Sequence, residues 1–472
     1  MPIRIKKSFL LLFLTIVYGC ATFHPAPLSP SSTAADFESR TLASPGLRTF
    51  IESNLHRGVT PWPPESWDLT LLTLAAFYYH PDLDVARAQW EVKEAGVITA
   101  GGRPNPSAGF IPQYHANPRG LSPWTLMFSL DIPVETAGKR GYRIEKAAHL
   151  STAARMNIAE AAWRVRSRLR DTLLSLYHAA ETKRILGEQE EIQGEIVSLL
   201  QRRSDLGEDS VFAVTQADVA LQHTRLSLLE AEKEVVRLGA AVATSVGLSP
   251  EAVDGTTITF DFLSAPSPTI PPKDLRQQAL LHRPDILALL AEYEAAQSAL
   301  HLDIARQYPD IHLGPGYSWD QGDNEWSLGF SLTLPVFNRN QGPIAEALAR
   351  RKEVAARFTS LQAKVIGEIG RTEAGYRGSL RKLGGADALV STQRKKLMGT
   401  QARYKSGEED RISLLTAELE LSSAGQSHLE AFTEAQRYAG LLEDALQQPL
   451  DSSEILSADI EADPRRKEGP SK

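Results

Sequence analysis

The sequence lacks several features that would otherwise narrow its class. Cys20 is the one cysteine in 472 residues, so an intrachain disulfide is excluded. The apolar run at residues 9–17 is shorter than the roughly 20 residues that a membrane-spanning helix needs. There is no excess of positive charge, because 51 Lys and Arg stand against 58 Asp and Glu. Without a basic surface to hold a phosphate backbone, nucleic-acid binding is not expected.

Enzymatic motifs are also missing. The chain has neither a Gly-x-Ser-x-Gly nucleophile elbow nor a His-Glu-x-x-His zinc motif, and Gly138-Lys139 lacks the upstream glycine of a phosphate-binding loop. Its 11 histidines are dispersed, without a pair at metal-binding spacing on a helix. We expect His178, His223 and His428 to lie on packed or solvated helix faces. The sequence therefore predicts a protein that is not an enzyme and has no cofactor and no bound metal.

The N-terminus has the features of an export signal. Basic residues at positions 4–7 precede the apolar run, and Val17-Tyr-Gly-Cys20 places a small residue before the cysteine, as in bacterial lipoprotein processing sites. We therefore expect residues 1–19 to be a signal peptide and Cys20 to carry lipid. Ala21 stands where an aspartate would favour retention in the inner membrane, so we expect sorting to the outer membrane. The alternative is ordinary signal cleavage that leaves an idle cysteine.

Most of the chain is built from a repeated unit. Trp124-Thr-Leu-Met-Phe-Ser-Leu-Asp-Ile-Pro-Val134 returns, 202 residues later, as Trp326-Ser-Leu-Gly-Phe-Ser-Leu-Thr-Leu-Pro-Val336. Stretches rich in proline and serine precede the first copy and separate the two, and such a composition suits spacers. The predicted segments are a lipid-anchored tether and periplasmic segment at 20–63, a first repeat at 64–263, a linker at 264–272, a second repeat at 273–450 and a flexible tail at 451–472.

Alternating hydrophobicity predicts two strands in each repeat. Apolar residues alternate with small or polar ones over 311–319 and 326–334, which are joined by a polar turn at 321–324. The first repeat does the same over 107–116 and 124–134. Strands of about ten residues with one apolar and one polar face fit a transmembrane β-barrel, although a soluble sandwich has the same pattern. Four strands cannot close a barrel, so the membrane interpretation requires several chains to share one.

A long helix and a shorter one follow each strand pair. Residues 143–205 and 344–406 each predict one helix of roughly 90 Å, which turns at Gly207 or Gly407 into a second helix with a heptad seam. The seam residues are Val214, Leu221, Leu228, Val235 and Val242 with Ala217, Thr224, Ala231 and Leu238 in the first repeat, and Leu414, Leu421, His428, Ala435 and Leu442 with Ala417, Ala424, Ala431 and Tyr438 in the second. A solid coiled coil without a pore is the alternative.

Glycines interrupt the second long helix at Gly367, Gly370, Gly375, Gly378, Gly384 and Gly385. Each costs about 1 kcal/mol of helix stability relative to alanine. Either close packing against a neighbour offsets this cost, or the adjacent pair Gly384-Gly385 kinks the helix. The sequence leaves both open.

Acidic residues occupy both hairpin turns. They are Glu208 and Asp209 in the first, and Glu408, Glu409 and Asp410 in the second. If several chains assemble around an axis, these carboxylates form a ring at the far opening, which would favour cations or dock a partner. Asp209 and Asp410 are also expected to cap the helices that follow. The two interpretations are compatible.

Taken together, these features resemble the TolC-like outer-membrane efflux family over nearly all of the mature chain. The most specific motifs are Tyr404-Lys-Ser-Gly407 followed by Ser413-Leu-Leu-Thr-Ala-Glu418, and the strand end Leu334-Pro-Val-Phe-Asn338. The other strand end, Asp131-Ile-Pro-Val-Glu-Thr-Ala-Gly-Lys-Arg140, resembles the heavy-metal, CzcC-like branch, whose members serve cobalt, zinc, cadmium or copper pumps.

The resemblance implies an α+β membrane protein that forms a homotrimer. Four strands per chain would complete a shared twelve-stranded β-barrel in the outer-membrane lipid, and the long helices would continue it as an α-helical barrel across the periplasm. A periplasmic adaptor (membrane fusion protein) and an inner-membrane pump of the resistance-nodulation-division type would supply substrate and energy. The chain itself would be a passive, gated duct.

One motif departs from the family pattern. The best-known member closes its inner end with aspartates where this chain has Ser413 and Thr416. An acidic gate must therefore use other residues, and our hypothesis is that Glu408, Glu409 and Asp410 form it. Two other functions stay open, namely a duct that exports peptides or polysaccharide and a pore-less structural lipoprotein that spans the periplasm.

Overall fold

The computed structural model describes residues 22–263, 273–450 and Arg465. The predicted signal peptide, Cys20, the linker at 264–272 and nearly all of the predicted tail lie outside these described residues. The chain divides into two compact units, Met1–Arg40 and Thr41–Lys472. Described residues of the first unit include helix α2 (Pro30–Glu38), which buries no side chain. It begins inside the stretch predicted to be a spacer, because proline fits the first helical position, where its missing N–H is not needed.

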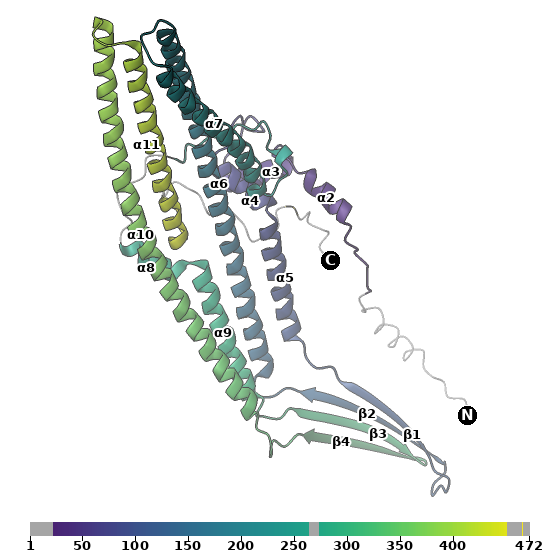
Figure 1. The fold of residues 1–472 in the computed structure, drawn as a ribbon. Helices are drawn as coiled ribbons and strands as arrows, with labels where there is room; N and C mark the ends of the chain where they lie inside the picture. Colours follow the sequence, from purple (N-terminus) through teal and green to yellow (C-terminus); the bar gives the residue numbers. More distant parts are fainter. Residues whose placement is uncertain (1–21, 264–272, 451–464, 466–472) are drawn as a thin grey trace. The chain divides into compact units, whose positions relative to one another are not determined.

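The second unit is mostly helical with one small antiparallel sheet (Figure 1). Its order of helix, two strands, long helix and shorter helix occurs in each half. The elements are α3 (Pro45–Leu55), α4 (Leu69–Tyr79), α5 (Pro81–Gly101), β1 (Ser107–Tyr114), β2 (Trp124–Val134), α6 (Lys139–Asp205), α7 (Val211–Val246), the 3-10 turn η1 (Pro250–Ala252), α8 (Lys273–His282), α9 (Pro284–Ala305), β3 (Ile311–Asp320), β4 (Asp323–Leu332), α10 (Gln341–Ser406) and α11 (Arg411–Leu446).

The four strands that the alternation predicts are present, and they pair in the order β1-β2-β3-β4. The register stacks an aromatic row across them, with ring centroids 4.6 Å apart for Phe110 and Phe128, 6.5 Å for Phe128 and Tyr317, and 4.9 Å for Tyr317 and Trp326. No described residue covers this apolar face. Every residue of β4 is exposed, and Trp326 has 82% of its surface accessible.

Strand boundaries differ from the prediction in three places. β1 ends at Tyr114 and not at residue 116, and the turn between β3 and β4 is shorter than expected. The expected polar turn at 321–324 is a two-residue turn, because Gln321 and Gly322 have φ of 49° and 123° and Asp323 already belongs to β4. Positive φ at both central positions suits the twist of a tight hairpin. β4 also ends two residues early, at Leu332, ahead of Pro335, which has no N–H to donate.

The helices lie in two rows that share α6 and α10. Near the sheet, α5, α6, α9 and α10 follow one another, and beyond them α7, α6, α11 and α10 do so (Figure 1). α6 has 67 residues and α10 has 66, so each is about 100 Å long. The predicted heptad seams face inward, where they include the buried residues Leu221, Thr224, Ala231, Leu238 and Val242 of α7 and Leu414, Ala417, Ala424, Ala431, Ala435 and Leu442 of α11.

The glycines of α10 do not break it, since the helix is continuous through Gly384-Gly385. Gly375 has a packing reason, because a methyl group there would lie 2.1 Å from the ring of Tyr438 in α11. The other five predicted positions have open space within the chain. Close packing inside one copy therefore explains a single glycine of the six.

Candidate functional site

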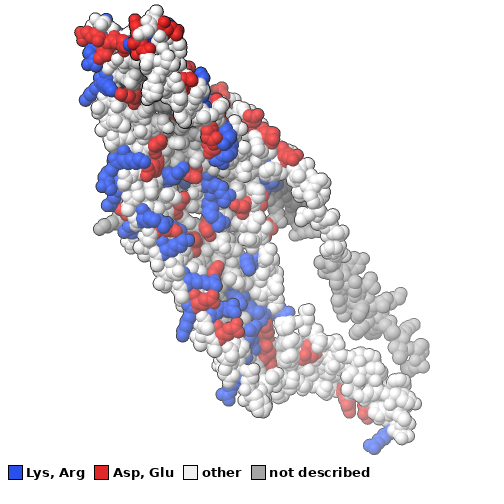
Figure 2. Space-filling model, viewed as in Figure 1, with Lys and Arg blue, Asp and Glu red and all other residues white. Residues whose placement is uncertain are grey.

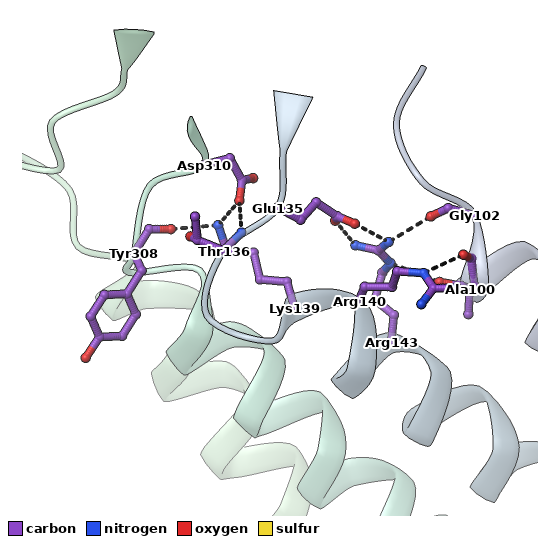
Figure 3. Close-up of polar contacts among 10 residues, drawn as sticks. Ala100, Gly102, Glu135, Thr136, Lys139, Arg140, Arg143, Tyr308 and Asp310 are labelled. Atoms are coloured by element: carbon purple, nitrogen blue, oxygen red, sulfur yellow. Dashed lines mark hydrogen bonds and ion pairs between the residues drawn. The ribbon is translucent and has the colours of Figure 1, made fainter. Parts of the chain in front are cut away.

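The segment that leads from β2 into α6 meets the segment that leads from α9 into β3, at the end of the sheet nearest the helices (Figure 3). Lys139, at the start of α6, is buried, and its Nζ donates to Oδ1 of Asp310 at 2.8 Å and to the carbonyl of Tyr308 at 2.6 Å. The backbone N–H of Thr136 donates to the same Asp310 oxygen at 2.9 Å. Thr136 and Lys139 thus both bind the carboxylate of Asp310, which immediately precedes β3.

Arg143 connects the segment between β2 and α6 to the end of α5. Its Nη2 donates to Glu135 Oε2 at 3.0 Å and to the carbonyl of Gly102 at 3.1 Å, and its Nε donates to the carbonyl of Ala100 at 3.3 Å (Figure 3). Arg140 adds a bond from Nε to the carbonyl that follows Ala100, at 2.7 Å. The motif at residues 131–140, which suggested the heavy-metal branch, therefore holds the end of the sheet against the helices. We call its contacts, through Glu135, Thr136, Lys139 and Arg140, the clamp.

Replacing Lys139 by alanine should lower the free energy of unfolding by about 2 kcal/mol, because Asp310 would lose its cation in a half-buried site. The matched control is Lys146→Ala, a lysine that is exposed on the same helix. The free energy would be measured by denaturant unfolding in detergent. Equal values for the two variants would show that the clamp is not a stabilising contact.

The two hairpin turns at the opposite end have the predicted glycines. Gly207 and Gly407 both have φ of 79°, a left-handed conformation that glycine adopts without strain. Asp410 caps α11, because its Oδ1 accepts from the N–H three residues later at 2.8 Å. The prediction that Asp209 caps α7 is wrong. Ser210 does so at 3.2 Å, since it has the extended backbone of a cap and Asp209 lies one position too early.

Each turn also holds an arginine-to-acid ion pair. Arg203, four residues before its glycine, has Nε 2.7 Å from Asp209 Oδ2, and Arg403, in the equivalent place, has Nε 3.2 Å from Glu409 Oε1. Glu208 lies 3.9 Å from the Arg203 Nε. Acids and bases therefore alternate at the tips instead of forming a purely acidic patch, as the mixed red and blue atoms at that end show (Figure 2).

Two further ion pairs connect one hairpin to the other. Nη1 of Arg203 lies 2.9 Å from Asp410 Oδ2, and Nε and Nη2 of Arg411 donate to the two carboxylate oxygens of Glu195, each at 2.8 Å. The N–H that Asp410 caps and the cation of Arg203 together lower the pKa of Asp410. Among the described residues, the Glu408 carboxylate takes part in no ion pair.

The other predicted tip residues have local roles. Ser413 supplies the backbone N–H that Asp410 caps. The hydroxyl of Thr416 donates to the carbonyl of Ile412 at 2.8 Å, inside α11. No hydrogen bond among the described residues joins either side chain to the other hairpin.

Sequence reasoning missed the arginines that hold the tips together. Arg203 and Arg403 were detectable, because both stand four residues before the turn glycine, where a cation suits a helix C-terminus. Arg411 and Glu195 lie 216 residues apart, and no local pattern connects them.

A buried group of charges joins α6 to α11. Arg166 is 1% exposed, and its Nη1 and Nη2 both lie 3.2 Å from Glu443 Oε2, with Arg170 Nε 3.6 Å from the same oxygen. Trp163 Nε1 donates to Asp444 at 3.0 Å. Burial raises the pKa of Asp444. The two halves of the chain are thus connected through one carboxylate shared by two arginines.

In residues 22–263 and 273–450, no group of three or more His, Cys, Asp or Glu side chains is arranged so that it could hold a metal ion. Helices in the same ranges are all too short or too polar to cross a membrane.

Comparison with known proteins places these features in a family. The profile described as "Outer membrane efflux protein" matches residues 78–248 and 275–446. The chain is 26% identical over 270 residues to the cobalt-zinc-cadmium resistance protein CzcC of Cupriavidus metallidurans, which is 57% of this chain and 62% of the relative. It is 24% identical over 241 residues to the probable outer membrane lipoprotein SilC of Salmonella typhimurium, which is 48% and 50% of the two chains.

A solved structure gives the same fold. The outer membrane protein VceC of Vibrio cholerae superimposes with a TM-score of 0.65 at 20% identity, over 81% of this chain and 97% of the other. The alignments to CzcC and SilC span between half and two thirds of those relatives. The resemblance predicted from the strand and hairpin motifs is confirmed.

Proposed function

The chain belongs to the outer membrane efflux protein family, and on that basis we propose that it is the channel subunit of a tripartite efflux system, a passive duct fed by a periplasmic adaptor and an inner-membrane pump of the resistance-nodulation-division type. It is an outer-membrane protein that extends into the periplasm. The observation that carries the proposal is the uncovered four-stranded sheet, whose apolar face and two unpaired edges need lipid and other strands.

The arrangement of elements supports a closed ring of copies. The sheet ends at β1 on one side and β4 on the other, and the helix rows end at α5 and α7 on one side and at α10 on the other (Figure 1). Each copy thus offers one edge to the next, and such head-to-tail contacts form a ring when the rotation between neighbouring copies closes. Three copies, as the family resemblance implies, give a twelve-stranded barrel that continues into an α-helical barrel.

α7 has an apolar line that this ring would cover. Its members lie on the side away from the seam with α6 and are 52% to 76% exposed, and they are Phe212, Val219, Leu226, Leu229 and Val236. Three of them are seven residues apart, which is the spacing of a second coiled-coil contact. In the ring the next helix is α10 of a neighbouring copy, where Gly378, Gly384 and Gly385 leave open space for apolar side chains.

Changing Leu226 and Leu229 together to glutamate should dissociate the ring, because three subunit interfaces would each bury unpaired charge. The native mass of the protein extracted in mild detergent would fall from that of three chains to that of one. Ser227→Glu, at an exposed position between them, is the matched control and should leave the mass unchanged. A double variant that kept the three-chain mass would place the interface elsewhere.

The hairpin tips form the gate in this proposal. Arg203–Asp410 and Arg411–Glu195 hold the two hairpins of each copy together, and Glu408, with Glu409 and Asp410, gives the opening its preference for cations. Replacing the three acids by alanine should therefore reduce cation preference as well as loosen the closed state.

Acid should open the gate. Because the pKa of Asp410 is lowered, its contacts are present above the ordinary carboxylate range and are lost as the pH falls through the lowered value. The closed-state current should stay constant from about pH 7 to about pH 5 and rise below about pH 4. A current that rises already near pH 6 would point to histidine and not to Asp410.

Metal cations are the proposed cargo, because CzcC is named as a cobalt-zinc-cadmium resistance protein. The direct test is growth of cells that lack the chain in Co²⁺, Zn²⁺ and Cd²⁺. Tolerance should return with the wild-type chain and with Ser227→Glu, but not with the Leu226 and Leu229 double variant. Unchanged tolerance in the deletion strain would leave other small toxic compounds as the cargo.

We also propose that Cys20 carries lipid, which the name of SilC as a probable outer membrane lipoprotein supports. The mass of the N-terminal peptide would show the acyl chains. Cys20→Ser should remove them.

A further inference from the structure

Two histidines lie on the polar face of the sheet, one near each end of β2. Thr125 and Asp131 share this face of β2, because they are an even number of residues apart. His312 is opposite Pro133, on the same face as Asp131. His115 follows β1, and its Nε2 lies 3.0 Å from Thr125 Oγ1. Each histidine therefore has a polar partner on β2.

The hydrogen bond of His312 fixes its tautomer. Its Nδ1 lies 3.0 and 3.1 Å from the two carboxylate oxygens of Asp131. An ionised carboxylate only accepts, so Nδ1 carries the hydrogen. In the neutral ring, Nε2 then keeps its lone pair, and no described residue donates to it.

Two successive hydrogen bonds place the hydrogen of the neutral His115 ring on Nε2, whereas in His312 it is on Nδ1. The Thr125 hydroxyl has one hydrogen, which it donates to the carboxylate of Asp320. Its oxygen must therefore accept from Nε2–H of His115. Nδ1 of this ring is left with the lone pair, again without a donor among the described residues.

This chemistry favours one class of cation. A neutral imidazole whose other nitrogen is hydrogen-bonded towards a carboxylate has the arrangement of metal-binding histidines. Imidazole suits zinc, copper and nickel, whereas magnesium and calcium prefer oxygen ligands. Since no described group of three ligands surrounds either ring, binding would be weak, which is what a conducting pathway requires.

We infer that His312 and His115 are two successive weak binding sites for late first-row divalent cations, with Asp131 and Asp320 as positioning residues. Their partners on β2, Thr125 and Asp131, are six residues apart, or about 20 Å. The inference rests on the proposed function, because the polar face becomes the wall of a lumen only when copies close a barrel. If the inference is right, the barrel wall would select late first-row metal cations, whereas the acidic tips would favour cations in general.

The test is the K⁺ current of the purified full chain in planar bilayers, with Zn²⁺ or Mg²⁺ added. Zn²⁺ should reduce the current at concentrations at which Mg²⁺ has little effect. The variant with His115→Ala and His312→Ala should conduct K⁺ normally and respond to Zn²⁺ only as it does to Mg²⁺. Asp131→Asn, which keeps both rings, should weaken the response to Zn²⁺ roughly tenfold. His223→Ala, at an exposed position of α7, is the matched control and should behave as wild type.

The outcomes separate this inference from the proposed function. A wild-type current with the same response to Zn²⁺ and Mg²⁺, or a double variant that responds to Zn²⁺ as wild type does, overturns the inference and leaves the channel standing. No current from the wild-type chain overturns the proposed function, and the inference with it. Native mass shows that each variant has assembled, and Asp131→Asn provides the comparison if the double variant has not.

Discussion

A variant with Arg203→Ala and Arg411→Ala should conduct under conditions in which the wild-type channel is shut. Two ion pairs that join the hairpin tips of one copy would be lost, namely Arg203 with Asp410 and Arg411 with Glu195. Exposed ion pairs are individually weak. The ring repeats both pairs in every copy, however, and all of them must break when the opening widens.

We expect the ratio of open to closed channels to rise at least about tenfold, which corresponds to about 1.4 kcal/mol for the whole ring. Single-channel recording measures this ratio directly. Arg184→Ala is the matched control, because Arg184 pairs with Glu181 and Glu188 of its own helix and connects no hairpins. A ratio that did not differ between the double variant and this control would show that the gate depends on other contacts.

The second large effect concerns stability. Glu443→Ala should lower the free energy of unfolding by about 3–5 kcal/mol, because Arg166 and Arg170 would remain buried without their carboxylate. Denaturant unfolding of the detergent-solubilised protein would measure it. Glu420→Gln is the control, since Glu420 pairs with Lys396 in an exposed site, and it should change the value by less than about 1 kcal/mol.

A third variant distinguishes charge from packing at this place. If Arg166→Met, Arg170→Met and Glu443→Leu are combined, no arginine is left without its carboxylate, and Asp444 keeps its hydrogen bonds from Trp163 and Ser167. Well-packed apolar groups then replace a buried ion group with little net cost. Most of the lost stability should return. If it did not, the hydrogen bonds of these arginines to α11, such as Arg170 to the carbonyl of Gln436, would be the larger contribution.

The periodicity of apolar residues predicted the strands and the helix seams, because these elements bury apolar side chains at regular intervals. The strand 124–134 and the inward seam through Leu221 and Leu238 follow from which side chains must leave water, and the structure has both. Boundaries that depend on single backbone angles were less accurate. The turn at Gln321-Gly322 is shorter than predicted, because two positive φ values complete it.

The candidate site was predictable only where chemistry is local. The turn glycines and the cap by Asp410 could be read from the chain, whereas Ser210 displaced Asp209 as a cap by a shift of one residue. The cross-hairpin pair of Arg411 and Glu195 depends on how two distant hairpins lie beside each other. Periodicity within either hairpin carries no information on that placement.

The open edges of the sheet and the helix rows have a genetic consequence. If three copies close head to tail as proposed, every copy takes part in two of the three contacts, once through α7 and once through α10. A single copy with a damaged α7 edge therefore weakens an assembly whose other two members are normal. If damaged and normal copies are made in equal amounts and mix freely, only about one ring in eight is fully normal. An allele of this kind should act as a dominant inhibitor of the wild-type gene, whereas a deletion should be recessive.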